Sequence, residues 1–179
     1  MRPSFIRGKL AADEEFLTMA ESFAPLIDER TEILIVGTMP GIKSLEEKQY
    51  YAHPRNAMWH IISRLYNQKF ASYKQKTECL LGHHIGMWDN LQYCERCGSL
   101  DSNIKNEIPN DFEHLLQQYP RVKKLLFNGQ KSFAFFKKYH PALLEQYQYR
   151  VMPSTSPANA SQKPEHKFET WRQELTERS

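Results

Sequence analysis

Apolar-rich runs that end at glycine, asparagine or proline mark the strands of this chain. The clearest is Ile33–Val36, which ends at Gly37. Comparable runs occupy residues 122–127 and 149–152, and the segment 82–91 favours a further short strand or a buried turn. Continuous apolar runs are typical of strands covered on both faces, as in a parallel sheet.

Apolar residues spaced three or four apart predict helices between these strands. They predict a helix in the N-terminal arm (residues 1–30) with Phe16, Leu17, Ala20 and Phe23 on one face, a helix with Asn56 at its N-cap, a helix opened by Pro109, a short helix with Phe133 and Phe136, and a closing helix with Phe168, Trp171 and Leu175. Strands that alternate with helices indicate one domain over residues 1–179, an open parallel α/β/α sandwich.

Composition adds that the chain is an ordinary globular protein with a mildly basic surface. It is 40% hydrophobic and 25% charged, with a net charge of +3 and a pI near 8.7. This balance permits nucleic-acid binding without requiring it. No apolar run reaches the length of a membrane span and the N-terminus lacks an apolar signal core, so we expect a cytoplasmic protein without membrane contact. Five lysines predict either a phosphate-facing stripe or a solvated face: Lys123, Lys124, Lys131, Lys137 and Lys138.

The cysteines raise the question of a metal site. Cys94 and Cys97 have zinc-type spacing, and His83 and His84 lie upstream with Cys79. A structural zinc usually takes four ligands, commonly as two closely spaced pairs, and the second pair is missing here. An odd number of cysteines in a protein expected inside the cell favours thiols over disulfides. We therefore expect no metal and no cofactor.

The candidate chemistry is concentrated after the first strand, in Gly37–Gly41 and Tyr50–Asn56. Parallel sheets place ligand sites at the carboxyl ends of their strands, where glycines let backbone amides approach a substrate. An aromatic ring, an imidazole and a carboxamide within one short span can hold a flat heterocycle and position a water beside it. The residues alone predict a pocket for a base or a nucleotide.

Several short motifs follow one another in a fixed order: Ser22–Pro25, Gln49–Asn56 with Trp59, Gly86–Asp89, Cys94–Arg96 with Gly98–Ser102, Phe127–Gly129, and Ser154–Asn159. Together they resemble the uracil-DNA glycosylase superfamily, most nearly its hypoxanthine (deoxyinosine) DNA glycosylase branch, the sixth family. The resemblance implies a three-layer α/β/α sandwich around a central, mostly parallel four-stranded sheet. It also implies a monofunctional, metal-independent DNA repair glycosylase that flips a deaminated base out of DNA and hydrolyses its N-glycosidic bond.

Met39 departs from the better-known branches of that superfamily. Uracil-removing relatives usually carry Asp, Asn or Glu there to orient the attacking water, and a thioether is too weak an acceptor for that task. The resemblance moves the task to Asn56, whereas the residues alone leave Asn56 equally suited to capping a helix. His53 is the second catalytic candidate. It either polarises the base or braces the loop through a backbone hydrogen bond.

The resemblance assigns base binding to Gly37, Thr38, Met39, Tyr51 and Asn128. Backbone amides around Thr38 and Met39 would face the base. Tyr51 would stack on it, the alternative being a core tyrosine. The Asn128 carboxamide would read the O6 and N1–H edge of hypoxanthine, an edge that uracil shares and adenine reverses.

The resemblance assigns minor-groove contact to the last loop, through Ser154, Ser156, Pro157, Ala158 and Asn159; the alternative is a plain turn. Ala158 is a small wedge, which favours lesions that are weakly paired and easily flipped. The leading hypothesis is a monomeric, nucleoid-associated enzyme acting on deoxyinosine in DNA. The alternatives are a uracil or xanthine glycosylase of the same fold and a catalytically silent nucleic-acid-binding module; a free-nucleotide hydrolase is disfavoured by the lack of a P-loop.

Overall fold

The computed structural model describes residues 17–177. The elements follow the order β1 (Leu17–Glu21), β2 (Ile33–Gly37), α1 (Ile42–Glu47), α2 (Met58–Tyr66), α3 (Tyr73–Gly82), β3 (Ile85–Asp89), β4 (Leu91–Cys97), η1 (Asp101–Asn103), β5 (Lys105–Pro109), α4 (Phe112–Gln118), β6 (Lys124–Asn128), α5 (Gln130–Tyr139), η2 (Pro141–Glu145), β7 (Gln148–Met152) and α6 (Pro164–Thr176).

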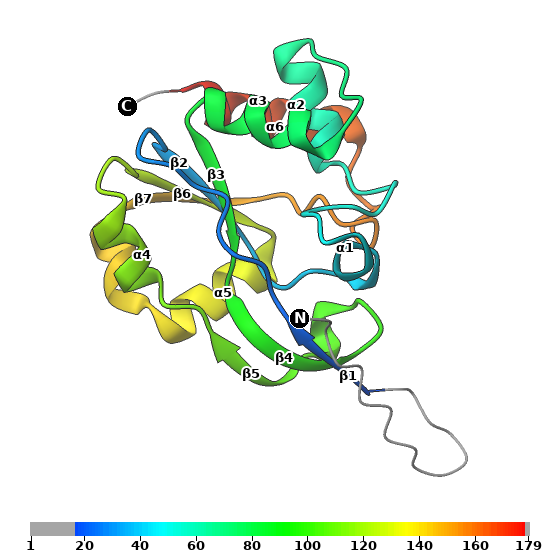
Figure 1. Cartoon of the computed structure of the whole chain (residues 1–179), viewed down its shortest axis with the longest axis vertical. Helices are drawn as coiled ribbons and strands as arrows, with labels where there is room; N and C mark the ends of the chain where they lie inside the picture. The colour runs from blue at the N-terminus through cyan, green and yellow to red at the C-terminus, as the bar shows by residue number, and fades with distance from the viewer. Residues whose placement is uncertain (1–16, 178–179) are drawn as a thin grey trace.

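The central sheet has the strand order β3-β2-β6-β7, and every neighbouring pair is parallel. Helices α2, α3 and α6 cover one face, and α4 and α5 cover the other (Figure 1). The predicted α/β/α sandwich with a parallel four-stranded sheet is therefore confirmed.

Strand β2 shows how the sequence builds this core. All five of its residues are buried. Ile33 and Ile35 pack into the cluster under α2, α3 and α6, whereas Leu34 and Val36 pack into the cluster under α4 and α5. Successive side chains of a strand point to opposite faces, so an unbroken apolar run serves both clusters.

A second, antiparallel sheet with the order β1-β4-β5 extends the molecule beyond β3 (Figure 1). Sequence analysis did not predict it, and the helix expected in the N-terminal arm is wrong where the structure describes that arm. Leu17–Glu21 is a strand that pairs with β4 from Cys97 to Tyr93. A few apolar residues are too short a pattern to separate the helical from the extended period, and pairing with β4 decides the outcome. Phe16 lies outside the described residues.

Two helix starts also differ from expectation. Helix α2 begins at Met58, yet the Asn56 side chain does accept the Met58 N–H at 2.9 Å. Pro109 ends β5 instead of opening α4, and Asp111 caps that helix by accepting the His114 N–H at 3.0 Å. Helix α3 was not predicted. No helix within residues 17–177 is long and apolar enough to cross a bilayer.

Candidate active site

The carboxyl ends of β2, β3 and β6 meet at one edge of the central sheet, and Gly37 lies there beside Asp89. A Cβ added at Gly37 would lie 2.2 Å from Asp89 Oδ1 and 3.0 Å from the Tyr51 hydroxyl oxygen. Only glycine fits this position, because the carboxyl and the phenol both press against its backbone. Gly37, Tyr51 and Asp89 therefore form one cluster.

A buried amide network fixes the strand ends beneath this cluster. Asn90 Nδ2 donates to the Gly37 carbonyl at 2.8 Å and to Ser132 Oγ at 3.0 Å. Asn110 Nδ2 donates to the Asp89 carbonyl at 2.8 Å. Buried amide groups that are hydrogen-bonded in this way hold a site on rigid elements.

The loop after β2 is held by the segment after β4. The buried Arg96 guanidinium donates to the Pro40 carbonyl and lies 3.6 Å from the Asp101 carboxylate. Ser99 Oγ accepts the Ile42 N–H at 2.9 Å. Two segments far apart in sequence thus form one rigid rim.

Met39 points away from this rim. Its side chain is 7% exposed and packs in a cluster with Ala20, Leu91, Cys94 and Phe135. Only its backbone can face a bound base. Within residues 17–177 the backbone N–H groups of Thr38 and Met39 donate to no protein acceptor, which leaves both available to a ligand.

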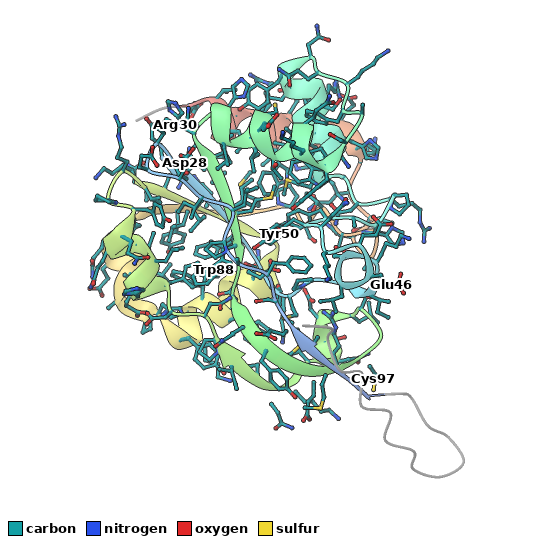
Figure 2. The ribbon with its side chains drawn as sticks, in the orientation of Figure 1. Asp28, Arg30, Glu46, Tyr50, Trp88 and Cys97 are labelled. Carbon is teal, nitrogen blue, oxygen red and sulfur yellow. The ribbon has the colours of Figure 1, made fainter. Side chains whose placement is uncertain are left out.

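Tyr51 adopts a backbone conformation that a bulky residue rarely takes, with φ of +54°. Its neighbours hold it there. Trp59 Nε1 donates to the Tyr50 carbonyl at 2.7 Å, and the Ala52 N–H donates to Ser44 Oγ at 3.1 Å. Figure 2 shows Tyr50 inside the molecule, next to α1. Strain of this kind persists where the surroundings over-determine it and clusters at functional sites.

For Asn56, the structure is compatible with both predicted roles, at the start of α2 and in holding a water. For His53, it favours the role of bracing the loop. The N-cap residue of α2 is Ala57, and Asn56, one residue earlier, accepts the Met58 N–H on Oδ1, which leaves one lone pair of that oxygen unused. The exposed His53 accepts the Arg55 N–H on Nδ1 at 3.1 Å, which matches the loop-bracing alternative. The hydrogen bond places the proton of a neutral imidazole on Nε2.

Asn128 joins the sheet to the last loop. Its Nδ2 donates to Thr155 Oγ1 at 2.9 Å, and its Oδ1 accepts the Thr155 N–H at 2.9 Å. The Thr155 carbonyl in turn accepts the Ala57 N–H at 3.0 Å. These bonds fix the amide orientation, with both ends of the amide facing the loop. Base reading by Asn128 stays a prediction.

The last loop folds on itself. Ser154 Oγ accepts the Ser156 N–H at 3.2 Å, and Asn159 Nδ2 donates to the Ser154 carbonyl at 3.1 Å. Pro157 and the exposed Ala158 form its tip. The serines and Asn159 therefore shape the loop, and the tip is presented to solvent.

A groove of about 430 Å³ lies between this loop and helices α2 and α6. Its lining carries Arg55, His60, Arg64 and Lys167 and no carboxylate. Arg64 is paired with Glu165 at 2.8 Å. A larger hollow of about 760 Å³ lies beside Lys124 and Tyr147, at the amino ends of the strands and away from the rim. The groove is therefore the hollow relevant to the site.

Two lysines of the predicted stripe form ion pairs with carboxylates of this chain. Lys124 is buried against Glu174 at 2.8 Å, and Lys138 pairs with Glu107 at 2.8 Å.

The cysteines are thiols, with Cys94 buried among apolar side chains. Within residues 17–177 no group of three or more His, Cys, Asp or Glu side chains is arranged to hold a metal ion.

Comparison with known families decides the identity of the fold. The family model described as the uracil DNA glycosylase superfamily matches residues 24–178. The chain belongs to that superfamily. This membership and the family resemblance predicted from the motifs are confirmed.

Relatives of this superfamily member include two archaeal proteins named hypoxanthine DNA glycosylase. The one from Methanosarcina barkeri is 38% identical over 142 residues, covering 78% of this chain and 87% of its own. The one from Methanosarcina acetivorans is 36% identical over 140 residues, covering 76% and 86%. A solution NMR structure from Methanosarcina acetivorans, named as a candidate uracil DNA glycosylase, has a TM-score of 0.74 at 33% identity and covers 89% of this chain and 99% of its own.

Sequence reasoning missed several residues that build the site of this superfamily member. Asp89 and Arg96 were quoted within motifs but received no role, and Asn90 and Ser132 were not singled out. The sequence does show an Asp-Asn pair at the end of an apolar segment. Its meaning depends on the neighbours that the fold brings against it.

Proposed function

We propose that this chain is a DNA glycosylase that removes hypoxanthine from deoxyinosine in DNA. The observation that carries the proposal is the cluster at the rim: the strained Tyr51 ring beside Gly37, with the Asn56 amide on the same loop. The two curated relatives named hypoxanthine DNA glycosylase support the substrate.

The flipped base would stack on Tyr51, a contact worth about 1–3 kcal/mol. The backbone N–H groups of Thr38 and Met39 would donate to the base as negative charge develops on it. Asn56 Oδ1, with its unused lone pair, would hold the water. The C1′–N9 bond breaks with its electron pair going to the base, the water oxygen bonds to C1′, and the departing base takes up a proton. Geometry suffices here, because an oxocarbenium-like sugar needs little nucleophilic power.

The last loop and the cation-lined groove beside it would bind the DNA backbone. Arg55 supplies positive charge, and Ala158 at the loop tip enters the minor groove as a small wedge. We also propose that the chain acts as a monomer on chromosomal DNA, which light scattering with and without an oligonucleotide would check.

The test is base release in a single turnover from oligonucleotides carrying deoxyinosine, deoxyuridine or deoxyxanthosine, single-stranded and paired, with EDTA present. We expect release from deoxyinosine and a loss of about a hundredfold or more in Asn56→Ala, with DNA affinity retained. Gln68→Ala, a change of side-chain amide outside the rim, is the matched control. Release from deoxyuridine alone would overturn the substrate, and no release from any lesion would favour a silent DNA-binding module.

A further inference from the structure

Asp89 is a buried carboxylic acid with no hydrogen-bond partner at the proposed pocket. It ends β3 and is 4% exposed. Its carboxyl takes part in no hydrogen bond within residues 17–177, although its backbone carbonyl is bonded to Asn110. Neither carboxyl oxygen is among the fully buried side-chain atoms that lack a partner, so the group keeps some contact with solvent and a ligand can reach it.

The carboxyl also lies in the cluster at the rim, beside Gly37 and Tyr51, two of the residues proposed to bind the base. Asp89 Oδ1 rests against Gly37, and the hydroxyl of the stacking candidate Tyr51 reaches the same point. Asn90 and Ser132 fix the strand ends beneath it. The group is therefore preorganised on rigid elements.

The surroundings of Asp89 favour its neutral form. Burial and, to a smaller extent, the Asp101 carboxylate raise the pKa of Asp89, the Arg96 guanidinium lowers it, and together they bring it to about 7. The remaining titratable neighbours are phenols: Tyr50, Tyr51 and Tyr73, whose own pKa values are raised by burial and by Asp89.

We propose that Asp89, as a neutral carboxylic acid, reads the edge of the flipped base: its O–H donates to O6 and its C=O accepts N1–H. The inference rests on the proposed function and names the residue that recognises the lactam edge. The O–H donor would also stabilise the negative charge that reaches O6 as the glycosidic bond breaks. Asn128 keeps one N–H and one lone pair beyond its bonds to Thr155, so Asp89 would read the base edge in addition to whatever Asn128 contributes.

A neutral acid can carry its proton on either oxygen. The neutral Asp89 carboxyl therefore distinguishes a lactam base from one methylated at N1. It does not itself reject adenine, which is instead excluded because a well-paired base is harder to flip out of the duplex. Ionisation removes the donor, so recognition falls about tenfold for each pH unit above the pKa of Asp89.

The test combines kinetics with binding of the free base. For wild type we expect single-turnover release from deoxyinosine to fall between pH 6 and pH 8 by about tenfold. Asp89→Ala should lose activity throughout this range. Asp89→Asn, which keeps one donor and one acceptor, should recover most of that loss and show no fall in rate over the same pH range. Calorimetry should show that wild type binds hypoxanthine more weakly at pH 8 than at pH 6, and binds 1-methylhypoxanthine poorly at both.

Two results would overturn the role of Asp89 while leaving the glycosylase intact. One is equal activity of wild type and Asp89→Ala on deoxyinosine, with both proteins folded by circular dichroism. The other is a pH profile that Asp89→Asn leaves unaltered, with hypoxanthine and its 1-methyl derivative bound equally well. Wild type that releases no base from any lesion would instead overturn the proposed function itself.

Discussion

Met39 shows how a residue can mislead when its direction is unknown. From the sequence alone, Met39 suggests the loss of a water-orienting side chain. In the structure it packs with Leu91, Cys94 and Phe135 and does not face the pocket. An apolar side chain is stabilised there by burial, so Met39 is a core residue and gives no support to a silent, decayed enzyme. That Asn56 holds the water remains a prediction.

Asp89 gives a prediction about stability at the scale of one residue. Its pKa is raised from 3.8 to about 7 by burial, so the folded chain holds a proton that the unfolded chain releases. Stability therefore falls as pH rises from about 4 to about 7 and is then level. Asp89→Asn removes this term. We expect its melting temperature to exceed that of wild type by a margin that grows between pH 5 and pH 7 and is level above pH 7.

Asp28→Asn, on the surface, is the control for that measurement. Asp28 is hydrogen-bonded to Arg30 and its pKa is lowered below 3.8, so its contribution to stability changes only below about pH 4, and the difference between Asp28→Asn and wild type should stay constant over the range in which that of Asp89→Asn grows. A difference between Asp89→Asn and wild type that stays constant with pH would contradict a shifted carboxyl at Asp89.

At the scale of elements, the site depends on loops tied to strands by side-chain amides. Asn128 ties β6 to the last loop through Thr155, and Asn90 ties β2 to α5 through Ser132. Such ties position the rim because strand ends alone fix only backbone direction.

Thr155→Val tests the tie between β6 and the last loop. It removes the oxygen that accepts from Asn128 Nδ2 at a position 1% exposed, while keeping the shape of the side chain. We expect a loss of about 1–3 kcal/mol in the free energy of unfolding and weaker DNA binding. Urea denaturation and fluorescence anisotropy measure the two effects. Thr176→Val, at an exposed helix end, should change stability by less than about 0.5 kcal/mol, and equal effects of the two changes would count against the tie.

At the scale of the whole molecule, charge is unevenly placed. The chain has 24 Lys and Arg against 21 Asp and Glu, yet no carboxylate lines the groove beside the last loop. This local excess of positive charge, which the small net charge does not reveal, is the basis for proposing that the groove binds phosphate.

Arg55→Gln tests that surface. We expect weaker binding to an oligonucleotide and a slope of log K against log salt that is shallower by about 0.9, the value for one phosphate contact. Arg121→Gln makes the same change of charge before β6, at the amino end of the sheet, and should leave the slope unaltered. Identical slopes for Arg55→Gln and wild type would place the DNA elsewhere.

Much of the fold could be predicted from the sequence because local pattern carries it. The runs at Ile33–Val36, 122–127 and 149–152 are strands, and the loops at their ends meet on one edge as parallel topology requires. The antiparallel sheet could not be predicted, because β1 and β5 are short, partly exposed strands that exist only through pairing with β4.

The sequence by itself determined the layers, the superfamily and the rim that carries the site, since apolar periodicity and ordered motifs are local properties of the chain. Only the tertiary structure decided what each side chain meets. Met39 faces the core, Asn128 is bound to Thr155, and the carboxyl of Asp89 rests unbonded against Gly37. The reason is physical: direction, burial and pKa depend on neighbours that are distant in the sequence and are brought close only when the strands pair.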